Sequence, residues 1–279
     1  MILRPAGPDD VPAIAGVMAA LDDPLEWPGV PGWPDLEHLV SRARVAVAEI
    51  DTTVVGFGGS IAVGRDDVRF VTDLYVHPAH HGQGVGTALL DDVLSGALGR
   101  FTFSSGDTRA LPVYIGAGMR PWWPLLYMAG GAEIALPRGI EVTPATVEET
   151  ALLSAGWTGV DRSRDFAHYA TLPDATGFTI RDGGSVAAIG WARRDRHAGG
   201  GRFLAHASIA PDADPVTSAI AIWTAAAAGQ RLLAAVPGPH PAVASLLKAG
   251  VRIEDRDTFC ATDAGLLDPV RILPNSGLL

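Results

Sequence analysis

The chain has 279 residues, of which 48% are hydrophobic and 19% are charged, and its formal net charge is −10. This composition suits one large or two ordinary domains with a buried core, and it excludes a disordered chain. The negative charge argues against non-specific nucleic-acid binding, which needs clustered Lys and Arg against phosphate.

Hydrophobic periodicity predicts a mixed order of strands and helices in the first half. Gly118 is expected to cap the last helix, and Pro121 and Pro124 to interrupt the final strand pair. The order, β-α-α-β-β-β-α-β-α-β, predicts an α+β sheet domain. In chain order the expected elements are a strand at 2–4, helices at 9–21 and 35–44 around a Pro- and Trp-rich loop at 22–34, strands at 45–50, 53–61 and 69–76, a helix at 84–98, a strand at 101–103, a helix at 109–117 and a strand pair within 119–128.

Residues 137–139, Pro-Arg-Gly, are expected to form a linker, after which the pattern begins again. We therefore predict a duplicated fold with domains at 1–136 and 140–279. Three landmarks recur in one order: 55–57 with 189–191, 74–78 with 207–211, and 117–118 with 249–250, at offsets of 190 − 56 = 134, 211 − 78 = 133 and 250 − 118 = 132.

Cysteine content and the length of apolar stretches indicate where in the cell the chain is expected. Cys260 is the single cysteine, so no disulfide forms within the chain, which fits a reducing, cytoplasmic location. The N-terminus lacks the long apolar run of a signal peptide. The longest low-charge apolar stretch, Val216 to Gly229, is too short to span a bilayer, so we expect no membrane association.

The segment from 74 to 90, LYVHPAHHGQGVGTALL, predicts a strand, a glycine-rich turn and a helix. Glycines at 82, 84 and 86 allow a tight turn with exposed N–H groups, and the helix adds the positive end of its dipole. Together they predict a diphosphate-binding cradle, to which Thr87 can add a hydroxyl donor. The alternative is a glycine-rich turn before an ordinary helix. A P-loop is excluded because the sequence does not contain G-x-x-x-x-G-K-S/T. A dinucleotide-binding fingerprint does not fit either, because the next strand has no acidic residue at its end.

The residues from His81 to Gly86 resemble the acyl-CoA signature R/Q-x-x-G-x-G/A of the GNAT superfamily of N-acetyltransferases. His81 departs from the usual Arg or Gln, so we expect weaker coenzyme A affinity but retained binding. A second family pattern, N-x-x-A-x-x-L/V-Y-x-x-x-G-F/M, is matched except at its first position. Its counterparts here are Asp107, Ala110, Val113, Tyr114, Gly118 and Met119.

The resemblance implies a three-layer GNAT fold, with a mixed, mainly antiparallel sheet flanked by helices. It implies acetyl-CoA as cofactor, with the pantetheine arm paired to main-chain groups of Leu74, Tyr75 and Val76. The Val76 N–H would face the thioester carbonyl as an oxyanion donor. The expected cofactor-binding residues are Leu74, Tyr75, Val76, His81, Gly82, Gln83, Gly84, Val85, Gly86, Thr87 and Asp107.

Two residues are candidates for the chemistry of acyl transfer to an amine. Tyr114 resembles the family's general acid, which protonates the departing thiolate; the alternative is a buried tyrosine that packs its helix on the sheet. Asp73 is the candidate base or amine anchor, expected on the same strand face as Val71 and Tyr75. Its alternative is a structural carboxylate bonded to a neighbouring segment.

The acceptor, a small-molecule or peptide amine, is expected against aromatic side chains, which attract ammonium groups. Trp27, Trp33 and Trp123 are the candidates; the alternative is that such rings fill the interface between the halves. His77, His80 and His81 are close in sequence, but no cysteine or carboxylate completes a ligand set, so we expect no metal.

The second half lacks the cradle glycines and carries Asp212, Asp214 and Pro215 there, with Leu246 at the position of Tyr114. It should bind coenzyme A poorly, and its expected role is structural. The apolar run from 267 to 279 is expected to pack across a surface as an arm. A homodimer is compatible with the sequence. The competing hypothesis for the whole chain is a non-catalytic acyl-CoA sensor or interaction module.

Overall fold

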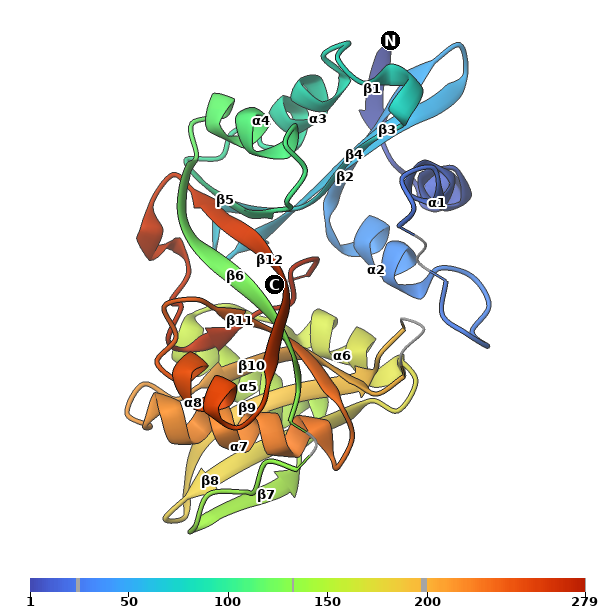
Figure 1. Ribbon diagram of the computed structural model, residues 1–279. Helices are drawn as coiled ribbons and strands as arrows, with labels where there is room; N and C mark the ends of the chain where they lie inside the picture. Colours follow the sequence, from blue (N-terminus) through green and yellow to red (C-terminus); the bar gives the residue numbers. More distant parts are fainter. Residues whose placement is uncertain (24–25, 132, 197–199, 279) are drawn as a thin grey trace. The chain divides into compact units, whose positions relative to one another are not determined.

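The computed structural model describes residues 1–23, 26–131, 133–196 and 200–278 (Figure 1). Pro24 and Leu25 of the predicted loop, and Leu279 of the predicted arm, lie outside the described residues. In the part of the chain that is described, no helix combines the length and hydrophobicity needed to cross a bilayer.

The chain divides into two compact units, and each unit includes a segment from the other half of the sequence. The first contains Met1–Pro121, Cys260–Leu266 and Leu278, and the second contains Trp122–Phe259 and Leu267–Gly277. The predicted linker at 137–139 therefore falls within the second unit. The Thr262 N–H donates to the Arg100 carbonyl at 2.9 Å, which ties the late segment to the first unit.

The first half forms its helices and strands in the expected order, and the strands of the first unit follow the order β1-β2-β3-β4-β5. β4 and β5 are parallel neighbours, whereas the other pairs are antiparallel. The elements are β1 (Ile2–Pro5), η1 (Pro8–Asp10), α1 (Val11–Ala19), α2 (Pro34–Arg42), β2 (Arg44–Ile50), β3 (Thr53–Val63), β4 (Arg65–Val76), η2 (Pro78–His80), α3 (Val85–Val93), β5 (Gly99–Ser104), α4 (Ala110–Gly116) and β6 (Arg120–Gly130).

The sequence of the second half repeats this order of elements, which confirms the predicted duplication and the predicted fold class. In the second unit the strand order is β12-β6-β11-β10-β9-β8-β7, with β13 paired to β10. The elements are β7 (Ile140–Pro144), α5 (Val147–Thr158), α6 (Ser163–Thr171), β8 (Thr176–Asp182), β9 (Ser185–Arg194), β10 (Arg202–Ile209), α7 (Pro215–Ala227), β11 (Leu232–Pro237), α8 (Val243–Lys248), β12 (Arg252–Ala261), η3 (Ala264–Leu266) and β13 (Ile272–Leu273).

A β-bulge interrupts the same strand of each repeat at equivalent positions. In β4, Val71 and Asp73 pair with consecutive residues of β3, which leaves Thr72 as the extra residue. In β10, Ala205 is the extra residue opposite β9. The bulges are separated by 205 − 72 = 133 residues, the spacing of the sequence landmarks. The two repeats therefore share this β-bulge as well as the order of their elements, although hydrophobic periodicity does not predict a bulge.

The prediction of a strand pair within 119–128 is wrong, because β6 is one continuous strand from Arg120 to Gly130. The register of β6 with β11 begins at Leu125. Pro121 and Pro124 precede that register, so their missing N–H groups remove no donor from it. The helix expected at 84–98 is also shorter, ending at Val93 before Gly96 adopts a φ of +82°.

The first unit is a sheet with helices on both faces (Figure 1). α3 contributes Val85, Leu89 and Leu90 to a buried cluster with residues of β2, β3 and β4. α1 and α2 lie on the opposite face, where α1 buries Ile14 and Val17. This arrangement leaves the loop between β4 and α3 at the edge of the α3 layer.

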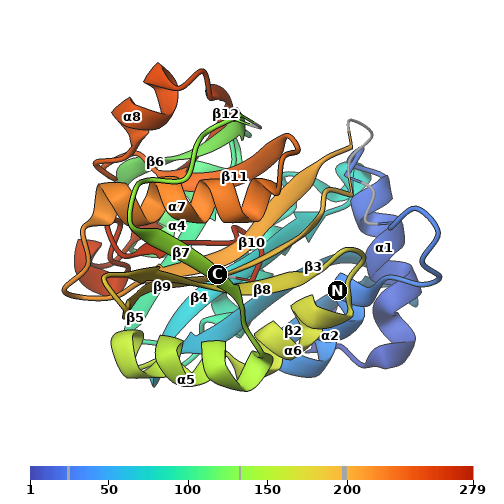
Figure 2. The same ribbon diagram turned by 90° about the horizontal axis from the view of Figure 1, so that it is seen from below.

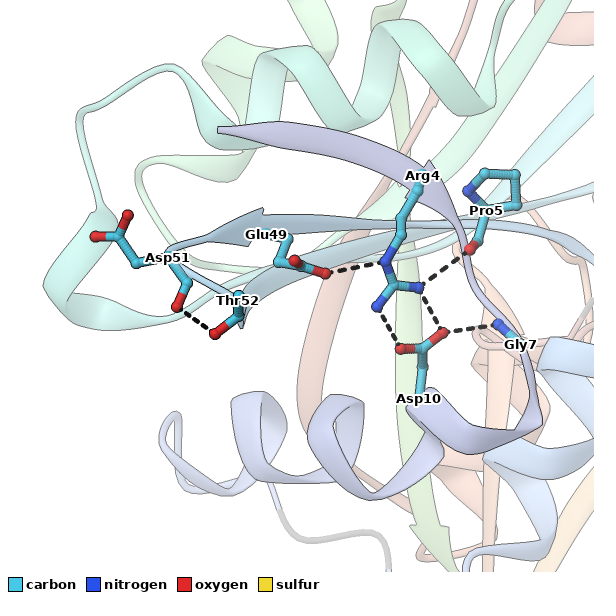
Figure 3. Close-up of polar contacts among 7 residues, drawn as sticks. All are labelled: Arg4, Pro5, Gly7, Asp10, Glu49, Asp51 and Thr52. Carbon is cyan, nitrogen blue, oxygen red and sulfur yellow. Dashed lines mark hydrogen bonds and ion pairs between the residues drawn. The ribbon is translucent and has the colours of Figure 1, made fainter.

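Arg4 fastens the N-terminal strand to its neighbours (Figure 3). Its guanidinium donates to both carboxylate oxygens of Asp10, at 2.8 and 2.7 Å, and Nε donates to Glu49 at 3.0 Å. Asp10 also accepts from the Gly7 N–H at 2.8 Å. The hydrogen bonds from Arg4 lower the pKa of the Asp10 carboxyl, so the carboxylate stays charged through neutral pH.

In the second unit α7 covers one face of β8–β10, and α5 and α6 cover the other (Figure 2). α7 buries Ala221, Ile222 and Trp223 in a cluster that also contains Leu204 and Leu273. The alanine-rich stretch read from the sequence is thus a core helix.

His240 makes the stability of the second unit depend on pH. Its side chain is 2% exposed, and Nδ1 accepts from the Ala242 N–H at 3.1 Å. Burial lowers the pKa of His240 from 6.5 to about 4. The unfolded chain then binds a proton more readily, so folding free energy is lost as pH falls from 6.5 towards 4.

His240→Asn keeps an acceptor for the Ala242 N–H but cannot take up a proton. Between pH 7 and pH 4.5 the wild type is expected to lose on the order of 2 kcal/mol more unfolding free energy than this variant. Urea unfolding at both pH values measures the difference. Equal losses in the two proteins would show that His240 does not titrate in this window.

Candidate functional site

β4 and β5 pair at their beginnings and then diverge. Their parallel register covers Val68–Phe70 and Gly99–Phe101. The next contact is a 2.9 Å hydrogen bond from the Thr102 hydroxyl to the Val71 carbonyl. β4 continues to Val76, so within the described register its last residues are not paired on the β5 side. The divergence leaves a gap between two strands, edged by main-chain groups.

The direction of the β4 backbone shows which groups face this gap. The His77 N–H donates to the Val55 carbonyl of β3 at 2.8 Å. Successive residues of a strand present their N–H and C=O groups to opposite sides. The groups of Leu74 and Val76 therefore point away from β3, and the Val76 carbonyl accepts from His81 Nε2 at 2.7 Å. The gap thus has N–H donors at Leu74 and Val76.

The turn between β4 and α3 presents a row of main-chain donors. Gly82 and Gly84 have φ values of +73° and +78°, a region that glycine adopts without strain. The first helical hydrogen bond of α3 runs from the Ala88 N–H to the Gly84 carbonyl at 3.0 Å. Among the hydrogen bonds of the described residues, none has a donor in the main-chain N–H groups of 82–87. These amides form an open anion cradle at a helix N-terminus.

Side chains border the cradle without filling it. Nothing lies within 4 Å of the position that a Cβ would take at Gly82 or Gly84. Gln83 Nε2 donates to the Ala79 carbonyl at 3.2 Å, and Thr87 is exposed on the first turn of α3. Val85 is buried in the core, so only its main chain is available at the turn.

His81 is engaged by the protein on both ring nitrogens. Nε2 lies 2.7 Å from the Val76 carbonyl, which assigns the ring proton to that nitrogen. Nδ1 then accepts from Nη1 of Arg109. His81 therefore bridges the end of β4 and the start of α4.

Arg109 stands beside the cradle and is held by Asp107. Its Nε lies 2.9 Å from Asp107 Oδ1, and its main-chain N–H lies 2.8 Å from the same atom. The hydrogen bonds from Arg109 lower the pKa of the Asp107 carboxyl to about 2. The Arg109 side chain is 57% exposed. A fixed, accessible guanidinium thus lies next to His81.

Sequence reasoning identified Asp107 and His81 but not Arg109. The available signal was the short spacing from Asp107 to Arg109 at a helix start, which predicts an Asx turn. That pattern does not reveal the contact with His81, because the two residues are 28 positions apart.

A second group of polar residues lies on the α1–α2 face of β4. The Tyr75 hydroxyl donates to Asp23 Oδ2 at 2.7 Å, and the Tyr75 ring stacks on Phe57 with a centroid distance of 5.4 Å. Asp73 precedes Tyr75 by two residues in an unbroken part of the register, so both point to this face. The face therefore carries two carboxylates and a phenol.

The expectation that Val71 shares the face of Asp73 is wrong. Val71 is fully buried in the α3 cluster, which Leu74 and Val76 also contact. The bulge at Thr72 adds one residue between Val71 and Asp73, and this reverses the alternation of side chains.

Tyr114 lies on α4 and is 7% exposed. Its side chain joins the cluster around α3, and its carbonyl accepts from the Met119 N–H at 3.1 Å. Leu246 occupies the equivalent position on α8, where its carbonyl accepts from the Val251 N–H at 3.1 Å. The backbone turn is conserved between the repeats, whereas the phenol is present only in the first.

The three candidate acceptor tryptophans have different environments. Trp27 is 2% exposed and its Nε1 donates to Asp35 at 3.0 Å, which fixes the loop to α2. Trp33 is half-buried at the start of α2. Trp123 belongs to the second unit and stacks on Phe259 with a centroid distance of 4.3 Å.

The histidine-rich turn does not gather metal ligands. His77 accepts from the Ala79 N–H through Nδ1 at 3.3 Å, and its ring lies edge-on to His80. Across the described ranges, no group of three or more His, Cys, Asp or Glu side chains is placed to hold a metal ion.

Comparison with known proteins relates part of the first half to a known domain. Residues 41–115 match the model of the acetyltransferase (GNAT) domain, which covers β3, β4, the cradle and α3. No curated protein matches the chain.

Solved structures match over nearly the whole chain and confirm the fold. A putative acetyltransferase from Pyrococcus horikoshii is 14% identical with a TM-score of 0.68, covering 99% of this chain and 92% of its own. A tandem GNAT protein from the clavulanic acid biosynthesis pathway is 14% identical with a TM-score of 0.63, covering 96% and 99%. A GCN5-related N-acetyltransferase from Sphaerobacter thermophilus is 16% identical with a TM-score of 0.58, covering 97% and 96%.

The fold is the one seen in these GNAT structures. Residues 41–115 match a GNAT domain, and the second half of the chain repeats the order of elements of the first, so the chain has a tandem GNAT fold.

Proposed function

We propose that the chain transfers an acetyl group from acetyl-CoA to a primary amine, and that the first repeat holds the cofactor. The observation that carries the proposal is the open row of N–H groups at 82–87 beside the diverging ends of β4 and β5. The cradle suits a diphosphate, and the gap suits an extended arm that pairs with a strand edge.

Arg109 supplies the cationic contact that His81 does not. A guanidinium forms two parallel hydrogen bonds to phosphate oxygens, whereas His81 already uses Nε2 on the Val76 carbonyl. Asp107 and His81 hold Arg109 in place before the cofactor arrives. This preorganisation reduces the entropy lost when the diphosphate binds.

Arg109→Ala is expected to raise the KM for acetyl-CoA about tenfold with little change in kcat, because the contact is made equally in ground and transition states. Arg65→Ala is the matched control. Arg65 is also an exposed arginine paired with an aspartate two residues away, with Nε 2.9 Å from Asp67. Steady-state kinetics measures the KM for acetyl-CoA in both variants. Equal KM values in Arg109→Ala and Arg65→Ala would show that Arg109 does not contact the cofactor.

Within the gap, the Val76 N–H supports the thioester carbonyl. It points away from β3, and an N–H group fixed by a sheet loses little entropy when it stabilises developing negative charge. The amine attacks the carbonyl carbon directly, the thioester C–S bond breaks, and the thiolate leaves with a proton that the Tyr114 hydroxyl donates. An acyl-cysteine route is disfavoured, because burial raises the pKa of Cys260, the single cysteine, to about 11.

The acceptor amine approaches the face of β4 that carries Asp73, Tyr75 and Asp23. Two carboxylates attract an ammonium group, and one of them can take the proton that the amine must lose before it attacks. Asp73 is assigned this role because it lies on the same strand as the Val76 donor. Trp33 stands on the same side of the first unit, at the start of α2.

Asp73→Asn is expected to lower kcat/KM for the amine at least about tenfold and to alter the acidic limb of the pH–rate profile. Asp66→Asn, an exposed change on the same strand, is the control. An unaltered profile in Asp73→Asn would exclude it as the base, and an equal rate would exclude it as an anchor.

The proposed activity is tested by release of coenzyme A from acetyl-CoA with a panel of amines comprising polyamines, amino sugars, amino acids and peptide N-termini. Acetylation of at least one amine is expected. Tight binding of acetyl-CoA with no transfer to any amine would instead indicate a non-catalytic acyl-CoA sensor.

A further inference from the structure

The second repeat keeps the groove of the first. Among the described residues, β10 and β11 pair only over Arg202–Phe203 and Leu232–Leu233, although β10 continues to Ile209 and β11 to Pro237. The strands therefore diverge as β4 and β5 do. The Ala210 N–H donates to the Ala187 carbonyl at 2.8 Å, which repeats the bond from His77 to Val55 in the first half.

The edge of β10 in this groove is paired with the C-terminal segment of the chain. In β13, Ile272 and Leu273 lie antiparallel to Ser208 and Ala207. The Ile209 N–H donates to the Arg271 carbonyl at 2.8 Å. Ile272 and Leu273 are 8% and 3% exposed, and Leu273 packs in the α7 core. The groove is thus filled by a buried strand.

The hydrogen bond from the Ile209 N–H lies at the position that the Val76 N–H has in the first repeat. Ile209 corresponds to Val76 by the repeat spacing, since 209 − 76 = 133. The Val76 N–H is the donor assigned above to the thioester carbonyl. In the second repeat the equivalent N–H is occupied by a peptide carbonyl, that of Arg271. Both acceptors are carbonyl oxygens presented by an extended chain along the strand edge.

The turn that follows β10 has the opposite polarity to the cradle. Nη1 of Arg271 donates to the carbonyls of Ala210 and Ala213 at 3.0 and 2.7 Å, so this turn presents acceptors to a cation. Asp214 caps α7 by accepting from the Thr217 N–H at 2.7 Å. The helix N-terminus, open in the first repeat, is therefore satisfied by a side chain.

We propose that residues 271–273 act as an intramolecular ligand, which occupies in the second repeat the groove that acyl-CoA occupies in the first. The peptide carbonyl of Arg271 takes the place of the thioester carbonyl, and its guanidinium binds the turn that precedes α7, at the carbonyls of Ala210 and Ala213. The chain consequently has one acyl-CoA site. The comparison with the cofactor rests on the proposed function, whereas the docking of the segment rests on the second unit alone.

Hydrogen exchange in the full chain tests the docking. Arg271→Ala removes the two bonds to the turn, and Leu273→Asp places a charge in the α7 core. Each is expected to speed exchange of the Ile209 amide at least about tenfold, because the segment opens more often. Arg252→Ala, on the exposed start of β12, is the matched control and should leave this amide unchanged.

Unchanged Ile209 exchange in both variants would overturn the docking. Titration of wild type with acetyl-CoA tests the stoichiometry, and two molecules bound per chain would overturn the claim of one site. If wild type binds no acetyl-CoA, the proposed function fails, while the exchange result still decides whether the segment docks. Arg271→Ala is the milder change and keeps the test usable if Leu273→Asp does not fold.

Discussion

Replacing Gly84 with aspartate is expected to weaken acetyl-CoA binding about a hundredfold or more, equivalent to about 2.7 kcal/mol. Gly84 is the N-cap of α3 and has a φ of +78°. An aspartate there would place a carboxylate beside the helix N-terminal amides, where it would compete with the diphosphate. Its negative charge would also repel the diphosphate.

Gly96→Asp is the control for backbone strain and added charge. Gly96 has a φ of +82°, nothing lies within 4 Å of its Cβ position, and it follows the opposite end of α3. Both variants should lose similar unfolding free energy, but only Gly84→Asp should lose cofactor affinity. Isothermal titration with acetyl-CoA measures the difference. Similar affinities in the two variants would place the diphosphate elsewhere.

Tyr114→Phe is expected to lower kcat about a hundredfold while leaving the KM for acetyl-CoA nearly unchanged. A thiolate leaving without a proton is a poorer leaving group, and phenylalanine fills the same volume but has no proton to donate. The resemblance of Tyr114 to the general acid of GNAT enzymes motivates this expectation. The equivalent Leu246 in the second repeat shows that the α-helical turn forms without the hydroxyl.

Steady-state kinetics with a competent amine, together with the thermal midpoint of unfolding, checks the role of Tyr114. A large loss of kcat at an unchanged midpoint assigns the hydroxyl to chemistry. A midpoint that falls in step with activity would make Tyr114 a packing residue, and wild-type turnover would remove it from the mechanism.

The fold and the cradle could be predicted because they depend on local patterns. Glycines at 82, 84 and 86 permit backbone conformations that other residues rarely adopt, as a tight turn requires, and they lie between a strand and an amphipathic helix. The repeat could be found because its landmarks keep a nearly constant spacing. The order of elements follows from hydrophobic periodicity, so it is predicted correctly even where the predicted ends of single elements are wrong.

The features that sequence reasoning missed depend on contacts between distant residues. The bulge at Thr72 is specified by the register with β3, and it moved Val71 to the opposite face. Arg109 reaches His81 only because α4 packs beside the end of β4. β13 is a two-residue strand, too short to show the alternation of apolar and polar residues that would predict its pairing with β10. The apolar run was recognised as an arm, but its groove could be identified only from the structure.

A crystal structure of the full chain with acetyl-CoA tests the central claim most directly. The account predicts the diphosphate within hydrogen-bonding distance of the main-chain amides of 82–87, with the pantetheine arm along Leu74–Val76 and β13 still in the groove of β10. Diphosphate density at the turn after β10, or a cofactor bound away from both strands, would contradict it.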